Sequence, residues 1–400
     1  MNKPWPKVKL GEVLRPNKRP YTLGPEEDAN LVGMRLYGEG PFHRELKPAM
    51  QISKKSHFVI RAGDVIYNKL FAWKGTFGIV PQELDGMFVS DKFPTYELNR
   101  EKVDENFLSW YFKCPPLWEE ARTMSTGSAA LSKLTLNPPK FLLLTIPLAP
   151  LAEQRRVVAR IEELAAQIHE ARNLRHEATE EAEALLSSAQ SALSHPVTAD
   201  SLSIEDLVGE DGLRNGKSVK SCGVESEIRC LTLSAMRNGR IDIRDSKPVP
   251  MSRTEAEPFQ VRTGDVFVIR GNGSKHLCGL AGLIADEAEG VIFPDLFIQV
   301  ALPKEQVVAE FFVAAWNSSA TRAVIEEKAK TTSGIWKINQ GHILSTRVPV
   351  PPLAEQRRIV AELDALQAEV DALKRLQAET AAELDAFLPA ILDRAFKGEL

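Results

Sequence analysis

Three charged residues in the last third of the chain have the spacing of a metal-dependent nuclease. Asp295 follows Pro294, and Glu326 and Lys328 come later in a Glu-Glu-Lys run. In such enzymes the carboxylates hold a divalent ion that activates water. The pattern is short, and residues 318–330 have the apolar spacing of a helix, whereas a nuclease normally places its Glu-x-Lys pair on a strand. A Mg-dependent DNA endonuclease that uses Asp295, Glu326 and Lys328 is therefore kept as the alternative function.

Two other motifs only partly match known ligand sites. Gly216-Lys217-Ser218 resembles the end of a phosphate-binding loop, but the position of its first glycine is Asp211, whose carboxylate would repel phosphate. Asn137-Pro138-Pro139 is similar to the start of a tetrapeptide with which amino-methyltransferases hold a flipped base. In this chain, however, Lys140 stands at the position where those enzymes have an aromatic residue. The sequence instead favours a turn before Phe141.

The segment from Gly271 to Lys275 is a better candidate for ligand contact. It joins backbone freedom, an amide side chain and a cation, directly after a predicted strand at 265–270. Such a loop can approach a phosphate or a base edge. The corresponding stretch of the first half, residues 68–74, is again cationic and contains aromatic residues. A solvated hairpin would have the same composition, so both readings stay open.

Cysteine and histidine spacing gives no sign of a metal site. The four cysteines form no Cys-x-x-Cys pair, and the seven histidines lack ligand spacing. This argues against zinc or a disulfide framework and fits a reducing cytoplasm. Residues 1–10 have no apolar core of a secretory signal, and no apolar run approaches the roughly 20 residues of a membrane span. We expect a cytoplasmic protein without membrane contact.

A heptapeptide, Pro-Leu-Ala-Glu-Gln-Arg-Arg, occurs twice in the chain. It stands at 150–156 and again, unchanged, at 352–358, a shift of half the chain. Softer matches extend the repeat outward, so the sequence predicts two copies of one module. A protein with two copies of one module tends to bind two similar partners or sites.

Each copy of the heptapeptide begins a long predicted helix. Residues 151–193 and 353–387 contain neither proline nor glycine, and prolines stand directly before both. Apolar or small residues recur in steps of four and three, the pattern of a coiled coil. The predicted seam of the first helix is Val157, Ile161, Leu164, Ile168, Ala171, Ala178, Ala182, Leu185 and Ala189. In the second helix it is Ile359, Leu363, Leu366, Val370, Leu373, Thr380, Leu384 and Phe387. We expect the two helices to pack antiparallel.

The remaining halves share a skeleton of short strands. Arg61-Ala-Gly-Asp-Val matches Arg262-Thr-Gly-Asp-Val, and each Gly-Asp pair predicts a tight turn before a buried strand. The expected fold is α+β, with two mixed α/β domains separated by two long helices. The predicted boundaries are 1–149 and 196–351 for the two domains. They are 150–195 for the central helix and 352–400 for the C-terminal one.

At these residues the chain resembles the DNA-specificity subunits of type I restriction-modification enzymes. The repeated heptapeptide is similar to the helix entry of that family. The start, Trp5 to Val13, and the end, Leu388 to Leu400, resemble its termini. One departure is the second module's start near Leu202, which lacks the tryptophan.

The resemblance implies a protein of phage defence that catalyses nothing itself. Its partners would be double-stranded DNA with a bipartite site and two methyltransferase (modification) subunits, with restriction or translocase subunits as further candidates. S-adenosylmethionine, Mg and ATP would be used by those partners. Each domain would read one half-site, and the helices would set the spacer.

Residue type and loop context give the candidate DNA contacts. In the first domain they are Lys69, Trp73, Lys74, Lys92 and Lys133, and in the second Arg270, Asn272, Lys275, Trp336 and Lys337. Residues 1–149 carry a formal charge of +5, which allows nucleic-acid binding without requiring it. A third hypothesis is a scaffold whose modules bind protein rather than DNA.

Overall fold

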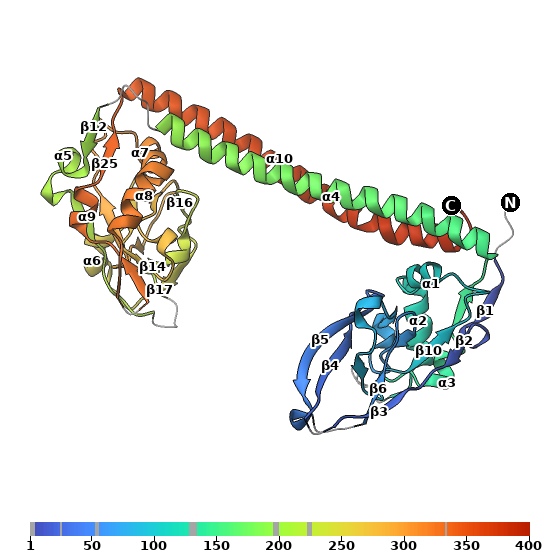
Figure 1. Ribbon diagram of the computed structural model, residues 1–400. Coiled ribbons are helices and arrows are strands. Elements are labelled where there is room, and N and C mark those ends of the chain that lie inside the picture. The colour runs from blue at the N-terminus through green and yellow to red at the C-terminus, as the bar shows by residue number, and fades with distance from the viewer. Residues whose placement is uncertain are drawn as a thin grey trace. The chain divides into compact units, whose positions relative to one another are not determined.

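The chain folds into two compact units, each with one globular module and a part of both long helices. The computed structural model describes residues 5–24, 26–52, 56–127, 134–194, 200–221, 226–332 and 334–400. Unit 1 comprises Met1–Leu174 and Ala378–Leu400, and unit 2 comprises Arg175–Gln377. The expected α+β class is confirmed, because each unit combines short strands with helices (Figure 1). The four predicted domain boundaries stay predictions.

The module of unit 1 contains three sheets. Strand β1 (Lys7–Lys9) pairs antiparallel with β11 (Thr145–Pro147). A four-stranded sheet has the order β2 (Leu14–Pro16), β10 (Thr95–Leu98), β7 (Val65–Tyr67) and β8 (Phe77–Ile79). A five-stranded sheet has the order β3 (Pro20–Thr22), β6 (Ser56–Val59), β9 (Phe88–Val89), β4 (Asp28–Met34) and β5 (Pro41–Pro48).

Three short helices complete this module: α1 (Glu105–Tyr111), α2 (Pro115–Met124) and α3 (Pro138–Phe141). The turn expected before Phe141 is in fact the one-turn helix α3, because two prolines at its start fix φ near the helical value. Phe141 is fully buried, and its ring stacks on Tyr67 with centroids 4.1 Å apart. The aromatic ring after the Asn-Pro-Pro motif therefore belongs to the core and is not available to a base.

The module of unit 2 contains four sheets. Strand β12 (Ser201–Ser203) pairs with β25 (Arg347–Pro349). The largest sheet has the order β13 (Leu213–Asn215), β22 (Phe297–Val300), β18 (Val266–Ile269), β20 (Ala281–Leu283), β16 (Arg240–Ile241) and β15 (Met236–Arg237). Two three-stranded sheets have the orders β17 (Ser246–Pro248), β14 (Arg229–Leu231), β21 (Val291–Ile292) and β19 (Gly271–Asn272), β24 (Ile335–Lys337), β23 (Lys330–Thr332). The helices are α5 (Ile204–Val208), α6 (Arg253–Ala256), α7 (Ala309–Asn317), α8 (Ser319–Lys328) and α9 (Gln340–Leu344).

The two predicted Gly-Asp turns are confirmed and have the same hydrogen bonds. In unit 1, Asp64 accepts from the N–H of Arg61, and Gly63 donates to Val80. In unit 2, Asp265 accepts from the N–H of Arg262, and Gly264 donates to Ile284. The strands that follow, β7 and β18, are buried at every position. The internal repeat is therefore a repeat of structure as well as of sequence.

Gly264 allows a test of this turn. Its φ is 90°, and no atom lies within 4 Å of a Cβ added there, so alanine would strain the backbone alone. Gly264→Ala is expected to lower the free energy of unfolding by about 1–2 kcal/mol, measured by denaturant titration. Gly273 has equally open surroundings without the left-handed φ, so Gly273→Ala is the matched control and should be neutral. Equal effects of both changes would contradict this account of the turn.

The long helices are α4 (Leu151–Ser194) and α10 (Leu353–Phe396), and they pack antiparallel in both units. In unit 1, Arg172 forms an ion pair with Asp385 (2.8 Å). In unit 2, Thr179 hydrogen-bonds Gln377 (2.8 Å), and Glu183 pairs with Lys374 (2.6 Å). The partner number falls as the α4 number rises, so the expected antiparallel packing is confirmed.

The seam of this helix pair differs from the predicted seam near its middle. Ala178 and Thr380 are exposed, as are Leu185 and Phe387. Instead, Arg175, Thr179 and Gln377 meet, and the Gln377 amide donates to the Arg175 carbonyl (3.0 Å). A straight helix drifts by ~20° per heptad from a strict 3.5-residue repeat. The middle of the helix pair has few large apolar side chains that could keep the heptad repeat in register. Polar contacts between the two helices replace the apolar seam there.

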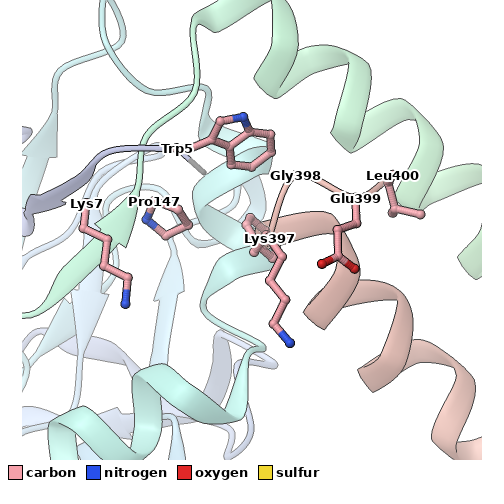
Figure 2. Close-up of a pocket in the computed structure, with 8 residues that line it drawn as sticks. Trp5, Lys7, Pro147, Lys397, Gly398, Glu399 and Leu400 are labelled. Atoms are coloured by element: carbon pink, nitrogen blue, oxygen red, sulfur yellow. The ribbon is translucent and has the colours of Figure 1, made fainter. Parts of the chain in front are cut away.

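The end of α10 packs against α1 and against Trp5, which precedes β1, in unit 1. The Phe396 ring lies 5.0 Å from Phe107 and 4.9 Å from Tyr111. Gly398, with φ of 78°, brings the chain against Trp5 (Figure 2). Lys7 and Lys397 border the same pocket, and Lys397 pairs with Asp393. The sequence segments at 5–9 and 388–400 are thus parts of one core in unit 1.

Candidate nucleic-acid interface

In each module, the backbone of one residue hydrogen-bonds two segments of the candidate surface. Lys69 donates its N–H to the carbonyl of Lys92 (3.0 Å), and its own carbonyl accepts from Leu136 (2.9 Å). Arg270 repeats the arrangement: its N–H donates to Leu296 (2.7 Å), and its carbonyl accepts from Ile338 (2.9 Å). Both residues come just after a buried central strand. The predicted residues Lys69, Lys92 and Arg270 therefore belong to one hydrogen-bond frame that occurs in both modules.

In unit 2 the structure places three of the five predicted residues on the sheet β19-β24-β23, with Arg270 directly before β19 and Lys275 in the 3-10 turn after it. Asn272 lies opposite Trp336, and Gly271 opposite Lys337. The Lys275 ammonium lies 5.2 Å from the centre of the Trp336 ring. Lys275 and Lys337 are exposed, while Arg270, Asn272 and Trp336 are half-buried. Residues from two distant parts of the sequence thus meet on one small sheet, with Asn272 and Trp336 on one side and Lys337 on the other. We name the exposed surface of this sheet, both sides together, the β24 face.

Lys330, which is not among the residues predicted from the sequence, also belongs to the β24 face. Lys330 is exposed and lies directly opposite Lys337 across the β23-β24 pair, so both side chains are on one face. Like charges at opposed positions destabilise a strand pair unless a counter-charge is present. The pair therefore favours an anionic ligand. In the sequence, the sign of this residue was a lysine directly before Thr331 and Thr332, a few residues ahead of Lys337.

In unit 1 the predicted residues form a looser group. Trp73 and Lys74 lie in a 3-10 turn (Ala72–Lys74), with the Lys74 ammonium 5.0 Å from the Trp73 ring centre. Lys69 and Lys92 lie on adjacent segments, as described above. Lys133 lies outside the described residues. The indole N–H of Trp73 is buried and has no partner among the described residues.

Tyr37 is a second residue that the sequence analysis missed. It is 54% exposed, its N–H donates to the carbonyl of Lys74, and its ring lies 5.6 Å from Trp118. Its φ is 60°, and Asn238, at the equivalent place in unit 2, has φ of 49°. Within the described ranges these are the two non-glycine residues with positive φ. Asn-Gly is a strong hairpin signal, whereas Tyr-Gly is not, so only the second turn could have been found.

Known proteins similar to this chain share one description. The EcoKI specificity subunit of Escherichia coli strain K12, a type I restriction enzyme, is 29% identical over 295 residues, 69% of this chain and 62% of that protein. The StySPI specificity subunit of Salmonella potsdam is 26% identical over 310 residues, 74% of this chain and 66% of that protein. No protein-family model matches the chain.

Two solved structures align with the whole chain. The HsdS subunit of Thermoanaerobacter tengcongensis has a TM-score of 0.60, 24% identity and 98% of its own length covered. A chain from a structure concerned with complex assembly of the type I R-M system has a TM-score of 0.69, 24% identity and 99% coverage. Fold and sequence similarity thus agree. The chain is similar in sequence to type I specificity subunits and in fold to an HsdS subunit. The sequence matches span only about two thirds of the length of those two curated relatives.

The nuclease alternative finds no support in the positions of Glu326 and Lys328. Glu326 pairs with Arg322 on α8 (3.3 Å), which is helical as expected. The Lys328 ammonium is half-buried and donates to Ser345 and Thr346 at the end of α9. Burial lowers the pKa of Lys328. Among the described residues, no group of three His, Cys, Asp or Glu side chains could hold a metal ion.

The Gly216-Lys217-Ser218 motif also has a structural role here. It follows β13, and the N–H of Lys217 donates to the carbonyl of Phe293. The Lys217 ammonium lies 5.7 Å from the Phe259 ring centre. A phosphate-binding loop would lead into a helix, and no helix starts between residues 216 and 221.

In the part of the chain that the structure describes, no helix is long and apolar enough to cross a membrane.

Proposed function

We propose that this chain is the non-catalytic DNA-recognition subunit of a type I restriction-modification complex. Each module would read one half of a bipartite site in double-stranded DNA, and α4 and α10 would set the spacer. One observation carries the proposal: the same backbone frame, centred on Lys69 and on Arg270, presents a cation-bearing surface in both modules. A repeated frame with different side chains suits two half-sites of different sequence.

The β24 face has the chemistry for both parts of DNA recognition. Lys275, Lys330 and Lys337 are exposed cations that would neutralise phosphates and release counterions. Asn272 carries an amide that can donate to and accept from an adenine edge in the major groove. Its Oδ1 accepts from the N–H of Ser274 (2.9 Å), which fixes the side chain. Phosphate contacts would set the register, and the amide would contribute sequence preference.

Partner docking is part of the same proposal. Unit 1 exposes Leu174 of α4 and Phe387 of α10, and unit 2 exposes Leu185 and Leu376. The shift of 202 residues relates Leu174 to Leu376 and Leu185 to Phe387. Each unit thus offers one equivalent apolar pair, which would suit two copies of a methyltransferase subunit. Restriction or translocase subunits would join them in the cytoplasm, and S-adenosylmethionine, Mg and ATP would be bound by these partners.

The proposal is tested by selecting bound sequences from a random duplex pool. The chain is co-expressed with its neighbouring methyltransferase subunit, and bound DNA is sequenced. A bipartite motif with an unread gap of fixed length is the expected result. A single contiguous motif would mean that one module reads DNA. Absence of any motif would favour a protein-binding scaffold, and Mg-dependent cleavage by the purified chain, abolished by Asp295→Ala and Lys328→Ala, would favour the nuclease.

The β24 face gives a second expected result. Lys337→Gln should weaken binding to all sequences alike and reduce the slope of log affinity against log salt by about 0.9, the share of one phosphate contact. The slope is measured by fluorescence anisotropy over a range of KCl concentrations. Lys304 is an exposed lysine outside these three strands, so Lys304→Gln is the matched control. An unchanged slope for Lys337→Gln would remove this lysine from the interface.

A further inference from the structure

The glutamine of the repeated heptapeptide is completely buried in both copies. Gln154 and Gln356 have no exposed surface, although each stands in the first turn of a largely exposed helix. A buried amide must find partners for its carbonyl oxygen and its N–H groups, because an unpaired one costs more than the hydrogen bond gains. Their partners therefore show what these residues hold in place.

Both glutamines make the same three hydrogen bonds. The Gln154 carbonyl accepts from the N–H of Asp104 (2.8 Å), and its Nε2 donates to the carbonyls of Lys102 (2.9 Å) and Ala149 (2.7 Å). In unit 2 the Gln356 carbonyl accepts from Val308 (2.8 Å), and its Nε2 donates to Gln306 (2.8 Å) and Pro351 (2.7 Å).

The residues that these amides bind are the ones that connect module and helix. Asp104 is the N-cap of α1, and Val308 is the N-cap of α7. Ala149 and Pro351 belong to the segments that lead into α4 and α10. Each glutamine thus ties three points together: the start of a module helix, the loop before it, and the entry of the long helix. Each amide thus links the module directly to the start of its long helix.

We call the contact between a module and the long helix that leaves it a joint. The two joints differ in their apolar contacts. In unit 1, Val157, Val158 and Ile161 of α4 and Leu392 and Ala395 of α10 are members of the module's own hydrophobic core. The ring contacts of Phe396 add to this joint.

In unit 2 the helix residues Leu193, Ile359, Val360 and Leu363 form a separate small cluster with α7, apart from the module's core. Besides Leu193, α4 makes polar contacts there: Ser191 hydrogen-bonds Ser319, and Gln190 donates to Ala314. Among the described residues, the second joint therefore has fewer apolar contacts that could replace the amide.

We propose that Gln154 and Gln356 are positioning residues that fix the angle between each recognition module and its long helix, and that the second module depends more on its glutamine. The consequence for DNA rests on the proposed function. A module held at a fixed angle accepts one spacer length, and a module with a loosened joint accepts several. The glutamines then determine spacer selectivity without contacting DNA.

The test uses Gln154→Met and Gln356→Met in the full chain with its methyltransferase partner. Methionine keeps the length and volume of glutamine and removes all three hydrogen bonds. Binding is measured on duplexes with the selected half-sites and spacers that are one base pair shorter, equal or one longer. For Gln356→Met we expect the preference for the native spacer to fall about tenfold, with half-site base preference unchanged. For Gln154→Met the fall should be about threefold or less.

A second readout does not depend on DNA. Spin labels at Glu287 and Ala368 in unit 2, or at Met50 and Ala166 in unit 1, report the distance between module and helix; all four positions are exposed. Cys222 is replaced by serine, which leaves three buried native thiols. Gln356→Met should broaden the unit 2 distance distribution, and Gln154→Met should broaden that of unit 1 less.

Controls separate this inference from a loss of stability and from the proposed function. Leu84→Ala removes a buried side chain of a separate cluster in unit 1 and should lower the melting temperature without changing spacer preference. Unchanged distance distributions and spacer profiles in both glutamine variants, with only a lower melting temperature, would overturn the inference. A wild-type complex without any bipartite motif would refute the proposed function instead, and the distance distributions would still decide the role of the glutamines.

Discussion

Inserting one heptad into both long helices is expected to lengthen the preferred DNA spacer by about three base pairs, since seven helical residues add about 10.5 Å and one base pair spans about 3.4 Å. The insertions copy residues 166–172 after Arg172 and residues 378–384 after Leu384. Because Arg172 pairs with Asp385, these two points lie opposite each other, so pairing is kept on both sides. Affinity for the original spacer should fall roughly a thousandfold, toward non-specific binding.

Random-pool selection on the insertion variant measures this directly. Both half-site sequences should be recovered unchanged, because neither module is altered. A heptad in α4 alone is the informative control. It would shift the α4 residues beyond the insertion relative to α10 and break the Thr179–Gln377 and Glu183–Lys374 contacts. Recovery of the original spacer from a folded double-insertion variant would show that the helices do not set the gap.

Arg322→Ala is expected to abolish recognition of the second half-site while the first is still read. Arg322 lies on α8 with 8% of its surface exposed. Its guanidinium donates to the carbonyls of Cys278 (2.7 Å) and His276 (3.1 Å), directly after Lys275. Burial lowers the pKa of this guanidinium, and Glu326 opposes that effect. Without the Arg322 guanidinium, the segment that carries Lys275 loses its hydrogen bonds to α8.

We expect Arg322→Ala to lower the free energy of unfolding by about 2–4 kcal/mol, because two buried carbonyls and a partly buried carboxylate lose their donor. Selection should then recover a single half-site in place of the bipartite motif. Val324 lies on the same helix and is 42% exposed, so Val324→Ala should be neutral in both assays. Equal loss of both half-sites would mean that the change unfolds the chain rather than one module.

Candidate residues show where sequence reasoning reached its limit. The loop 271–275 was identified from glycine, amide and cation content, which are local properties. That Trp336 and Lys337 share its sheet follows from long-range strand pairing, which the local properties of these residues do not reveal. Lys330 was missed because its significance lies in facing Lys337. The role of Gln154 was hidden for the same reason: its partners Lys102 and Asp104 are far away in the sequence.

The sequence by itself determined the duplication, the start of both long helices and the Gly-Asp turns. These depend on local constraints: proline fixes φ, glycine permits positive φ, and an uninterrupted run with helical spacing forms a helix. Only the tertiary structure decided the phase of the helix seam, the convergence of the β24 face and the burial of the two glutamines. Each of these depends on which distant segments pack together, and that balance of packing and hydrogen bonding is set by the whole fold.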